Sequence, residues 1–186
     1  MIGYLLIVFA FKITNAAESE CGVMPISQWS GEDSRRTAVL KTPVQLVVIQ
    51  HTVSPPCDTD QVCESIIRGI RVHHIVDLEF TDIGNSFLIG GNGRVYEGAG
   101  WHRVGAHTRG YNDKAISISF IGNFINEIPT PEALQAAQDL IACGVNSKLI
   151  AEDYDLVGHR QLSATQSPGD SLQDLIETWP HWKKYD

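Results

Sequence analysis

The stretch Val44-Gln45-Leu46-Val47-Val48-Ile49-Gln50 decides the fold class of this chain. It is an apolar run rich in β-branched residues, with Pro43 before it and the turn-forming residues 54–56 after it. Such a run, bounded on both sides by turn signals, predicts a buried β-strand. Gln50, His51 and Thr52 lie at the C-terminal end of this strand, at one edge of the predicted sheet.

An amphipathic helix is predicted directly after this strand, over residues 60–76. The segment Asp58-Thr59-Asp60 supplies a capping residue for the start of the helix. From there Val62, Ile66, Ile70 and His74 recur every four residues, which places them on one face. His74 then falls near the C-terminal end of the helix.

The remaining elements alternate between strands and helices. Two short strands are joined by a tight turn with an Asn-Gly pair, a later helix starts at Pro131, and a short helix closes the chain. Interleaved strands and helices predict an α/β domain with a central mixed β-sheet flanked by three helices. The predicted ranges are strands 86–89, 94–97, 116–124 and 155–159, the helix from Pro131 with Leu134, Ala137, Leu140 and Ile141 on one face, and the helix 171–179.

Composition limits the classes of partner. The chain has 186 residues, 43% of them hydrophobic and 19% charged, which fits one globular domain with a sizeable core. The formal charge of -8 gives an average field that repels a phosphate backbone, so nucleic acid is not expected as a partner. A neutral or mixed-charge ligand, such as a glycan or a peptide, is compatible with this charge.

The N-terminus has the pattern of a secretory signal peptide. The apolar run GYLLIVFAF at residues 3–11 is followed by Lys12 and by small residues up to Ala17. A membrane anchor is the alternative, but nine apolar residues fall short of the roughly 20 that span a bilayer. We therefore predict a signal peptide over residues 1–17, a mature domain over residues 18–186, no membrane span and an extracellular protein.

Four cysteines lie in the predicted mature chain, at positions 21, 57, 63 and 143. Secretion exposes them to an oxidising environment, and their even number indicates two disulfides. Three pairings are possible. The short spacing between Cys57 and Cys63 favours a bridge between these two, which leaves Cys21 for Cys143. A zinc site built from the four cysteines is disfavoured because the spacing of two residues between paired cysteines is absent.

A collinear series of motifs extends over residues 21–185. The motifs are Val48-Ile49-Gln50-His51-Thr52, Asp82-Ile83-Gly84, Phe87-Leu88-Ile89-Gly90, Val95-Tyr96-Glu97-Gly98, Gly100-Trp101, Gly105-Ala106-His107-Thr108, Ile121-Gly122-Asn123-Phe124, Ala142-Cys143-Gly144-Val145, Gly158-His159-Arg160, Ser167-Pro168-Gly169 and Trp179-Pro180. This series resembles the peptidoglycan recognition protein family, most of all its short secreted insect members. The resemblance implies a fold like that of N-acetylmuramoyl-L-alanine amidases and two disulfides that match the pairing favoured by spacing.

The resemblance also locates the zinc site of the family's amidases, and this chain departs from it. The two histidine ligands correspond to Gln50 and His159, the cysteine ligand to Ser167 and the assisting tyrosine to Asn85. A glutamine amide and a protonated serine hydroxyl are poor zinc ligands. Adjacent His51 is not expected to substitute, because neighbouring side chains of a strand point to opposite faces. We therefore expect no zinc, no other cofactor and no amidase activity.

A ligand-binding cleft is the second feature that the resemblance implies. In the family it holds the glycan-linked stem peptide, which needs apolar walls with a few directional polar groups. The corresponding positions here are His51, Thr52, His74, Glu79, Phe80, Asn85, Ala99, Trp101, Arg103, His107 and Asn112.

Two of these places bear on the type of peptidoglycan. Family members that prefer meso-diaminopimelic acid usually carry Gly-Trp where this chain has Glu79-Phe80, and an Arg where it has Ala99. Without that Arg, the extra carboxylate of diaminopimelate loses its charge-matched partner, and Glu79 favours a lysine ammonium instead. Lys-type peptidoglycan, typical of many Gram-positive bacteria, is the ligand predicted.

The function implied by the resemblance is that of a secreted immune receptor. We expect the protein to bind bacterial peptidoglycan in the haemolymph without cutting it, and to act through downstream recognition or protease-cascade proteins of the Toll or prophenoloxidase type. Two alternatives belong to other classes. One is a zinc-dependent amidase that scavenges peptidoglycan, and the other is a receptor for a different microbial glycan such as β-1,3-glucan.

Overall fold

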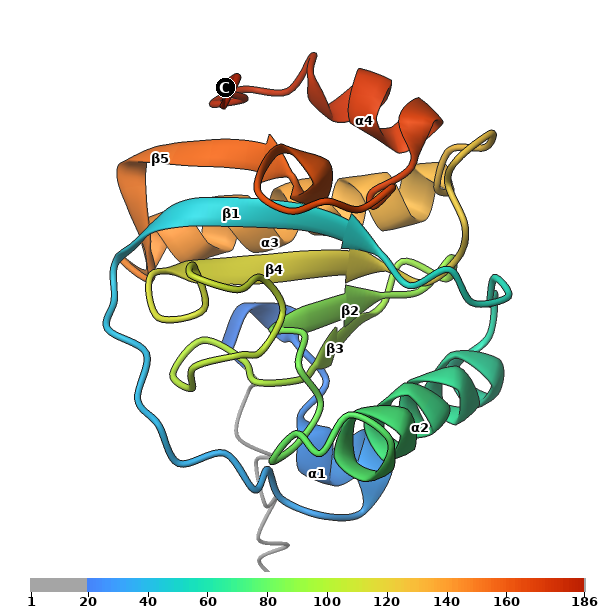
Figure 1. The fold of residues 1–186 in the computed structure, drawn as a ribbon. Helices are drawn as coiled ribbons and strands as arrows, with labels where there is room; N and C mark the ends of the chain where they lie inside the picture. Colours follow the sequence, from blue (N-terminus) through green and yellow to red (C-terminus); the bar gives the residue numbers. More distant parts are fainter. Residues whose placement is uncertain (1–19, 186) are drawn as a thin grey trace, which may run out of the picture.

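The computed structural model describes residues 20–185, which form a five-stranded mixed sheet in the order β3-β2-β4-β1-β5 (Figure 1). Strand β1 is parallel to β4 and β5, β2 is parallel to β4, and β2 and β3 form the antiparallel hairpin. This topology confirms the predicted fold class. The predicted signal peptide lies outside the described residues. The strands are β1 Val44–His51, β2 Phe87–Ile89, β3 Val95–Glu97, β4 Ala115–Phe120 and β5 Ile150–Gly158.

Helices lie on one face and at two edges of this sheet. Figure 1 shows α3 along the back face of the sheet, α4 beyond β5, and α1 and α2 on the side of β3. Thr59 caps α2 by accepting the Val62 N–H, and Thr130 caps α3, where Pro131 occupies the first turn. The helices are α1 Ile26–Ser30, α2 Asp60–Val76, α3 Pro131–Asn146 and α4 Asp170–Ile176, with single 3₁₀ turns at Glu20–Gly22 and His159–Gln161.

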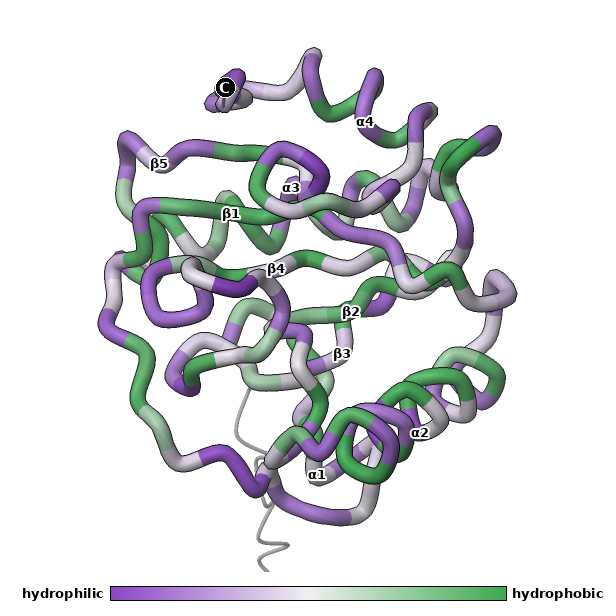
Figure 2. The backbone as a smooth tube through the Cα atoms, in the orientation of Figure 1, coloured by the Kyte–Doolittle hydropathy of each residue, from purple (hydrophilic) through white to green (hydrophobic). Residues whose placement is uncertain are grey.

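Alternation along β4 separates the core from the opposite face of the sheet. Ile116, Ile118 and Phe120 are fully buried in the main core, which includes residues of α3. Their neighbours Ala115, Ser117 and Ser119 face the other way, where small side chains leave room for the loops that cover this face. Figure 2 shows the hydrophobic colouring concentrated along β1, β4 and β2.

Helix α2 confirms the predicted face only in part: Ile66 and Ile70 pack partly buried against a core cluster, but the most buried residues lie one position further along the chain. Its buried residues are Cys63, Ile67 and Arg71, whereas Val62 of the predicted stripe remains 44% exposed. The buried residues differ from the predicted ones because Arg71 forms a buried ion pair with Asp82. Hydrophobic periodicity does not predict such an ion pair. Ile70 and His74 are half-buried and are left free to face a groove.

Several predicted boundaries also shift. The strand predicted over 116–124 ends at Phe120, because Gly122 has φ of 147° and turns the chain away from the ladder. The strand predicted over 155–159 begins at Ile150, His159 lies in a 3₁₀ turn, and the last helix spans Asp170–Ile176. Helix α1 was not predicted from the sequence.

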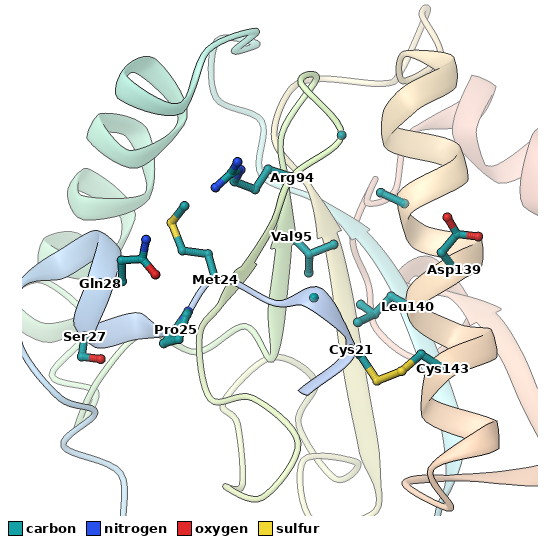
Figure 3. A pocket seen from close by; sticks show the side chains of 13 residues that line it. Cys21, Met24, Pro25, Ser27, Gln28, Arg94, Val95, Asp139, Leu140 and Cys143 are labelled. Carbon is teal, nitrogen blue, oxygen red and sulfur yellow. A yellow bond between two sulfur atoms is a disulfide. The ribbon is translucent and has the colours of Figure 1, made fainter. Parts of the chain in front are cut away.

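Both disulfides have the predicted pairing. Cys57–Cys63 closes the loop that leads into α2, and Cys21–Cys143 ties the N-terminal segment to α3 (Figure 3). Within residues 20–185, no helix has the length and apolar character needed to cross a membrane.

Candidate functional site

A groove with a volume of about 550 Å³ lies where β1 and β5 end. Parallel strands that end at the same edge leave their following residues close together, a common place for a ligand. The groove draws its walls from the end of β1, the C-terminal part of α2 and the loop after β5. Its lining residues are Gln50, His51, Thr52, Val53, Ile70, His73, His74, Leu78, Phe80, Asn85, Ala106, His107, Ile125, His159, Thr165, Gln166 and Ser167.

Gln50 occupies the end of β1 with its side-chain amide fully engaged. Its Nε2 donates to the carbonyl oxygen of His107 at 3.1 Å and to the hydroxyl of Thr108 at 3.3 Å. Its Oε1 accepts from Ser119 Oγ at 3.1 Å and from Asn85 Nδ2 at 3.4 Å. Since both N–H groups and the oxygen have partners, turning this amide toward a metal would break several buried hydrogen bonds at once.

His51, the next residue, is held by partners on other segments. Its backbone N–H donates to Ser167 Oγ at 3.1 Å, and its ring Nδ1 accepts the backbone N–H of Phe124 at 3.2 Å. Burial lowers the pKa of His51 to about 4, and the nearby charges of Arg160 and His159 act in the same direction. The ring is therefore neutral at pH 7.

His74 enters the groove from the last turn of α2. Its Nδ1 accepts the backbone N–H of Gly84 at 2.9 Å, and its ring lies 5.5 Å from that of Phe80 between centroids. Burial lowers the pKa of His74 to about 4, with smaller contributions from His73 and Arg36. This imidazole is also neutral at pH 7.

His107 belongs to a loop that covers the front of the sheet. Asn112 Oδ1 accepts the backbone N–H groups of His107 and Thr108 at 2.9 and 2.8 Å, which fixes the loop, and the ring Nδ1 lies 3.1 Å from the Thr108 hydroxyl. Burial lowers the pKa of His107 to about 3. Burial also lowers the pKa of His159, so His51, His74, His107 and His159 are neutral at pH 7.

A buried ion pair supports the segment that leads to Asn85. The carboxylate of Asp82 accepts from Arg71 Nε and from the backbone N–H groups of Arg35 and Ile83, at 2.7, 2.8 and 2.7 Å. Burial by itself raises the pKa of Asp82, but these hydrogen bonds and the Arg71 charge outweigh it and hold the pKa below its usual range. The segment is thereby fixed to both α2 and the N-terminal chain.

Six of the predicted binding residues come together in the groove, namely His51, Thr52, His74, Phe80, Asn85 and His107. The other five do not line it. Asn112 supports the loop of His107 from behind, and Glu79 is exposed on the chain between the groove residues Leu78 and Phe80.

Trp101, Arg103 and Ala99 lie outside this groove. Trp101 is 4% exposed and packs on Phe87 in the main core, with ring centroids 4.4 Å apart. Arg103 pairs with Glu97, and Ala99 is fully buried. Residue type alone does not indicate that the turn of residues 98–102 directs Trp101 into the core and leaves Arg103 half-buried against Glu97.

Sequence reasoning missed several apolar members of the groove. Val53, Leu78, Ala106 and Ile125 lie in loops, where hydrophobic periodicity has no meaning. Among these apolar residues, Ile70 could have been assigned to the groove from the sequence, because it lies one turn before His74 on the same helix face.

The positions that resemblance gives to zinc ligands, Gln50, His159 and Ser167, do border one groove. They do not fit the metal. Gln50 is saturated by hydrogen bonds, and the Ser167 hydroxyl is engaged by the His51 N–H. Among residues 20–185, no group of three or more His, Cys, Asp or Glu side chains could hold a metal ion.

A larger cavity of about 930 Å³ lies elsewhere, between the N-terminal segment and α3 (Figure 3). Met24, Val95 and Leu140 line it beside the Cys21–Cys143 bridge, and Arg94 and Asp139 also border it. It contains none of the predicted binding residues, so the groove at the end of β1 is the candidate site.

Known proteins are similar to this chain in sequence and in fold. A family model described as N-acetylmuramoyl-L-alanine amidase matches residues 40–170. A peptidoglycan recognition protein of Trichoplusia ni is 47% identical over 178 residues, covering 96% of this chain and 97% of that protein. This chain belongs to the peptidoglycan recognition protein family.

Solved structures of peptidoglycan recognition proteins agree closely with this member. The X-ray structure of PGRP-SA from Apis mellifera matches with a TM-score of 0.85 and 43% identity, covering 88% of this chain and 99% of that one. The ectodomain complex of PGRP-LCa and PGRP-LCx bound to tracheal cytotoxin matches with a TM-score of 0.85 and 42% identity, covering 87% and 98%. The amidase match extends from before β1 to the start of α4 and so includes Gln50, His159 and Ser167.

Proposed function

We propose that this peptidoglycan recognition protein binds bacterial peptidoglycan in the groove at the end of β1 and does not hydrolyse it. The observation that carries the proposal is the state of Gln50, whose amide is saturated inside a groove that remains open and lined by polar and apolar groups. A groove of this kind suits a sugar-peptide. The relative PGRP-LCa–LCx complex, which holds tracheal cytotoxin, supports a ligand of the same class.

The ligand proposed is the Lys-type stem. Glu79 is exposed between two groove residues, and Ala99 contributes no charge where diaminopimelate-preferring members have an Arg. The carboxylate of Glu79 favours a ligand ammonium, and position 99 lacks the Arg that would pair with the extra carboxylate of diaminopimelate. Side-by-side binding of matched Lys-type and diaminopimelate-type fragments tests this preference, and tighter binding of the diaminopimelate fragment would overturn it.

The proposed setting is extracellular. The apolar run near the N-terminus and the two disulfides support secretion, and haemolymph is the compartment expected for an insect-type member. After binding peptidoglycan, the protein would activate downstream immune proteins of a protease cascade.

A pull-down on insoluble Lys-type peptidoglycan tests binding and catalysis in one tube. The protein is incubated with the polymer and added Zn²⁺, and released stem peptide is measured alongside bound protein. We expect binding without release. Zinc-dependent release would show that another group completes the metal site, and displacement by β-1,3-glucan but not by soluble peptidoglycan would establish the glucan receptor instead.

A further inference from the structure

A further cavity, with a volume of about 510 Å³, lies between α3, β5 and the chain end that follows α4. It shares no lining residue with the groove at the end of β1. Ile141 and Val145 of α3, Leu156 of β5 and Trp179 give it an apolar lining. Its volume falls in the range of roughly 300–1,000 Å³ that is usual for small-molecule sites.

Backbone hydrogen bonds fix the chain end as one wall of this cavity. The N–H of Leu156 donates to the carbonyl oxygen of His181 at 2.9 Å, and the N–H of Lys183 donates to the carbonyl oxygen of Leu156 at 3.0 Å. The chain end therefore pairs with the edge strand β5, beyond which it lies in Figure 1. Because both backbone groups of Leu156 are engaged, a peptide cannot add to the sheet here, and recognition is left to side chains.

Two deeply buried aromatic residues of the cavity carry polar atoms without a partner. Tyr154 is 7% exposed and Trp179 is 9% exposed, yet nothing within residues 20–185 hydrogen-bonds the Tyr154 hydroxyl or the Trp179 indole N–H. Neither atom is occluded, whereas the indole nitrogens of Trp101 and Trp182 are buried without a partner. Since buried Tyr and Trp usually engage these groups, two accessible hydrogen-bonding positions remain for a ligand.

Ring and amide groups complete the lining. The exposed ring of His181 stacks on that of Tyr154, with centroids 4.3 Å apart and planes 19° apart. The exposed side-chain amides of Gln138 and Asn146 supply donors and acceptors. Burial raises the pKa of Tyr154, so its hydroxyl is protonated at pH 7 and can donate as well as accept.

This set of groups matches a neutral sugar ring. Asp, Glu, Lys and Arg are absent from the described residues that line the cavity, so a charged ligand finds no charged partner there. A neutral pyranose has apolar C–H faces that pack on aromatic rings. Its hydroxyl or N-acetyl groups need donors and acceptors at the edge of the ring, which hydroxyl, indole and amide groups supply.

We propose that this cavity is a second glycan site, which binds a neutral pyranose unit through the Tyr154 hydroxyl, the Trp179 indole N–H and the amides of Gln138 and Asn146. The site is separate from the groove that holds peptidoglycan in the proposed function. Two polymers supply such units: the N-acetylated strand of peptidoglycan and β-1,3-glucan. The same protein groups serve either source.

Indole signals of ¹⁵N-labelled wild-type protein test where a sugar binds. Chitotetraose and laminaritetraose are titrated separately, and the Trp179 signal is identified by its loss in W179F. We expect the Trp179 signal to shift with at least one of them, while that of Trp29, which donates to the carbonyl oxygen of Glu97, stays in place. A response to chitotetraose alone identifies the N-acetylated strand as the source, and a response to laminaritetraose alone identifies the glucan. No shift of Trp179 with either oligosaccharide would overturn the proposal.

A conservative substitution tests the hydrogen bond of Tyr154. Y154F removes a hydroxyl without a protein partner and keeps the ring. We therefore expect the oligosaccharide to bind about fivefold more weakly, the loss of one hydrogen bond, with unchanged thermal stability. Y185F is the control, because its hydroxyl donates to Asp155 at 2.9 Å and does not line the cavity, so its oligosaccharide affinity should match that of the wild type. Wild-type affinity in Y154F would contradict the assigned site.

The Lys-type muramyl tripeptide separates this inference from the proposed function. Y154F is altered outside the groove, so it should bind the tripeptide as the wild-type protein does. If the wild-type protein binds the tripeptide and neither oligosaccharide shifts Trp179, the second site fails and the proposed function stands. If the tripeptide is not bound but Trp179 responds to an oligosaccharide, the proposed function fails and the second site stands.

Discussion

Ser119 on β4 lies opposite Gln50 on β1, and its hydroxyl donates to Gln50 Oε1 over 3.1 Å. The small serine side chain leaves room for the glutamine amide to reach Asn85 and Thr108 as well. A polar network thus surrounds Gln50, the position that the resemblance assigns to a metal ligand. This network joins the ends of two central strands to the loops that form the groove.

Restoring the ligand set should restore zinc binding. We expect the double variant Q50H/S167C to bind about one Zn²⁺ per chain, because two imidazoles and a thiolate then surround one open position. Metal content after equilibrium dialysis, measured by atomic emission, checks this. The Q50A/S167A variant is the control with the same hydrogen bonds removed, and stoichiometric zinc in the wild-type protein would contradict the prediction.

Removing the charge of Asp82 should destabilise the whole domain. Asp82 is fully buried and Arg71 nearly so, therefore D82N removes the buried carboxylate that lies closest to this guanidinium and leaves it only the longer contacts with Glu32 and the Asp33 carbonyl. We expect the free energy of unfolding to fall by about 3–5 kcal/mol in urea titrations. The surface pair Glu64–Arg68 is the matched control, since E64Q should change stability by about 1 kcal/mol or less. Equal effects of the two substitutions would refute the role assigned to the buried pair.

The two disulfides should differ in their contribution to stability. Cys21–Cys143 joins residues 122 positions apart, whereas Cys57–Cys63 joins residues 6 apart. On the chain-entropy model, C21S/C143S should lower the free energy of unfolding by about 5 kcal/mol and C57S/C63S by about 2 kcal/mol. Denaturant titration of the two variants measures this difference. A larger loss from the short loop would mean that native contacts of that loop, rather than chain entropy, dominate.

Mild acid should destabilise the fold through the groove histidines. The folded pKa values of His51 and His74 are about 4 and that of His107 is about 3, all below the ordinary value near 6.5 of an unfolded chain. The unfolded state then binds more protons below pH 6.5, so stability is complete above that pH and falls progressively as pH approaches 4. Urea midpoints at pH 7, 6 and 5 test this, before most carboxylates titrate. A weaker slope is expected for H51N, and an unchanged midpoint in the wild-type protein would contradict the lowered pKa values.

Much of the fold follows from local signals in the chain. The β-branched run before Gln50, the capping Thr59 and Thr130, and the Asn-Gly turn each act over a few residues, so they specify strands, helices and a hairpin without tertiary information. Helix α1 escaped prediction because it is a single short turn with no capping side chain, held instead by contacts with distant residues such as Glu97.

The site was only partly predictable. Six of the residues predicted to bind ligand lie together in the groove, since strand ends and helix ends can be located from the sequence. Trp101 and Arg103 could not be placed, because the same motif permits a side chain to face a cleft or the core, and packing on Phe87 and pairing with Glu97 decide between them.

The sequence by itself determined the α/β class and favoured one disulfide pairing, because these depend on residue type and spacing. Only the tertiary structure decided which residues of α2 are most deeply buried, how Gln50 is saturated and which ring nitrogen of His51 and His74 accepts a backbone N–H. Those properties depend on partners such as Asp82, Ser119, Phe124 and Gly84, which are distant from them in the chain or lie beyond a turn. Hydrogen-bond geometry between such segments exists only once the chain has folded.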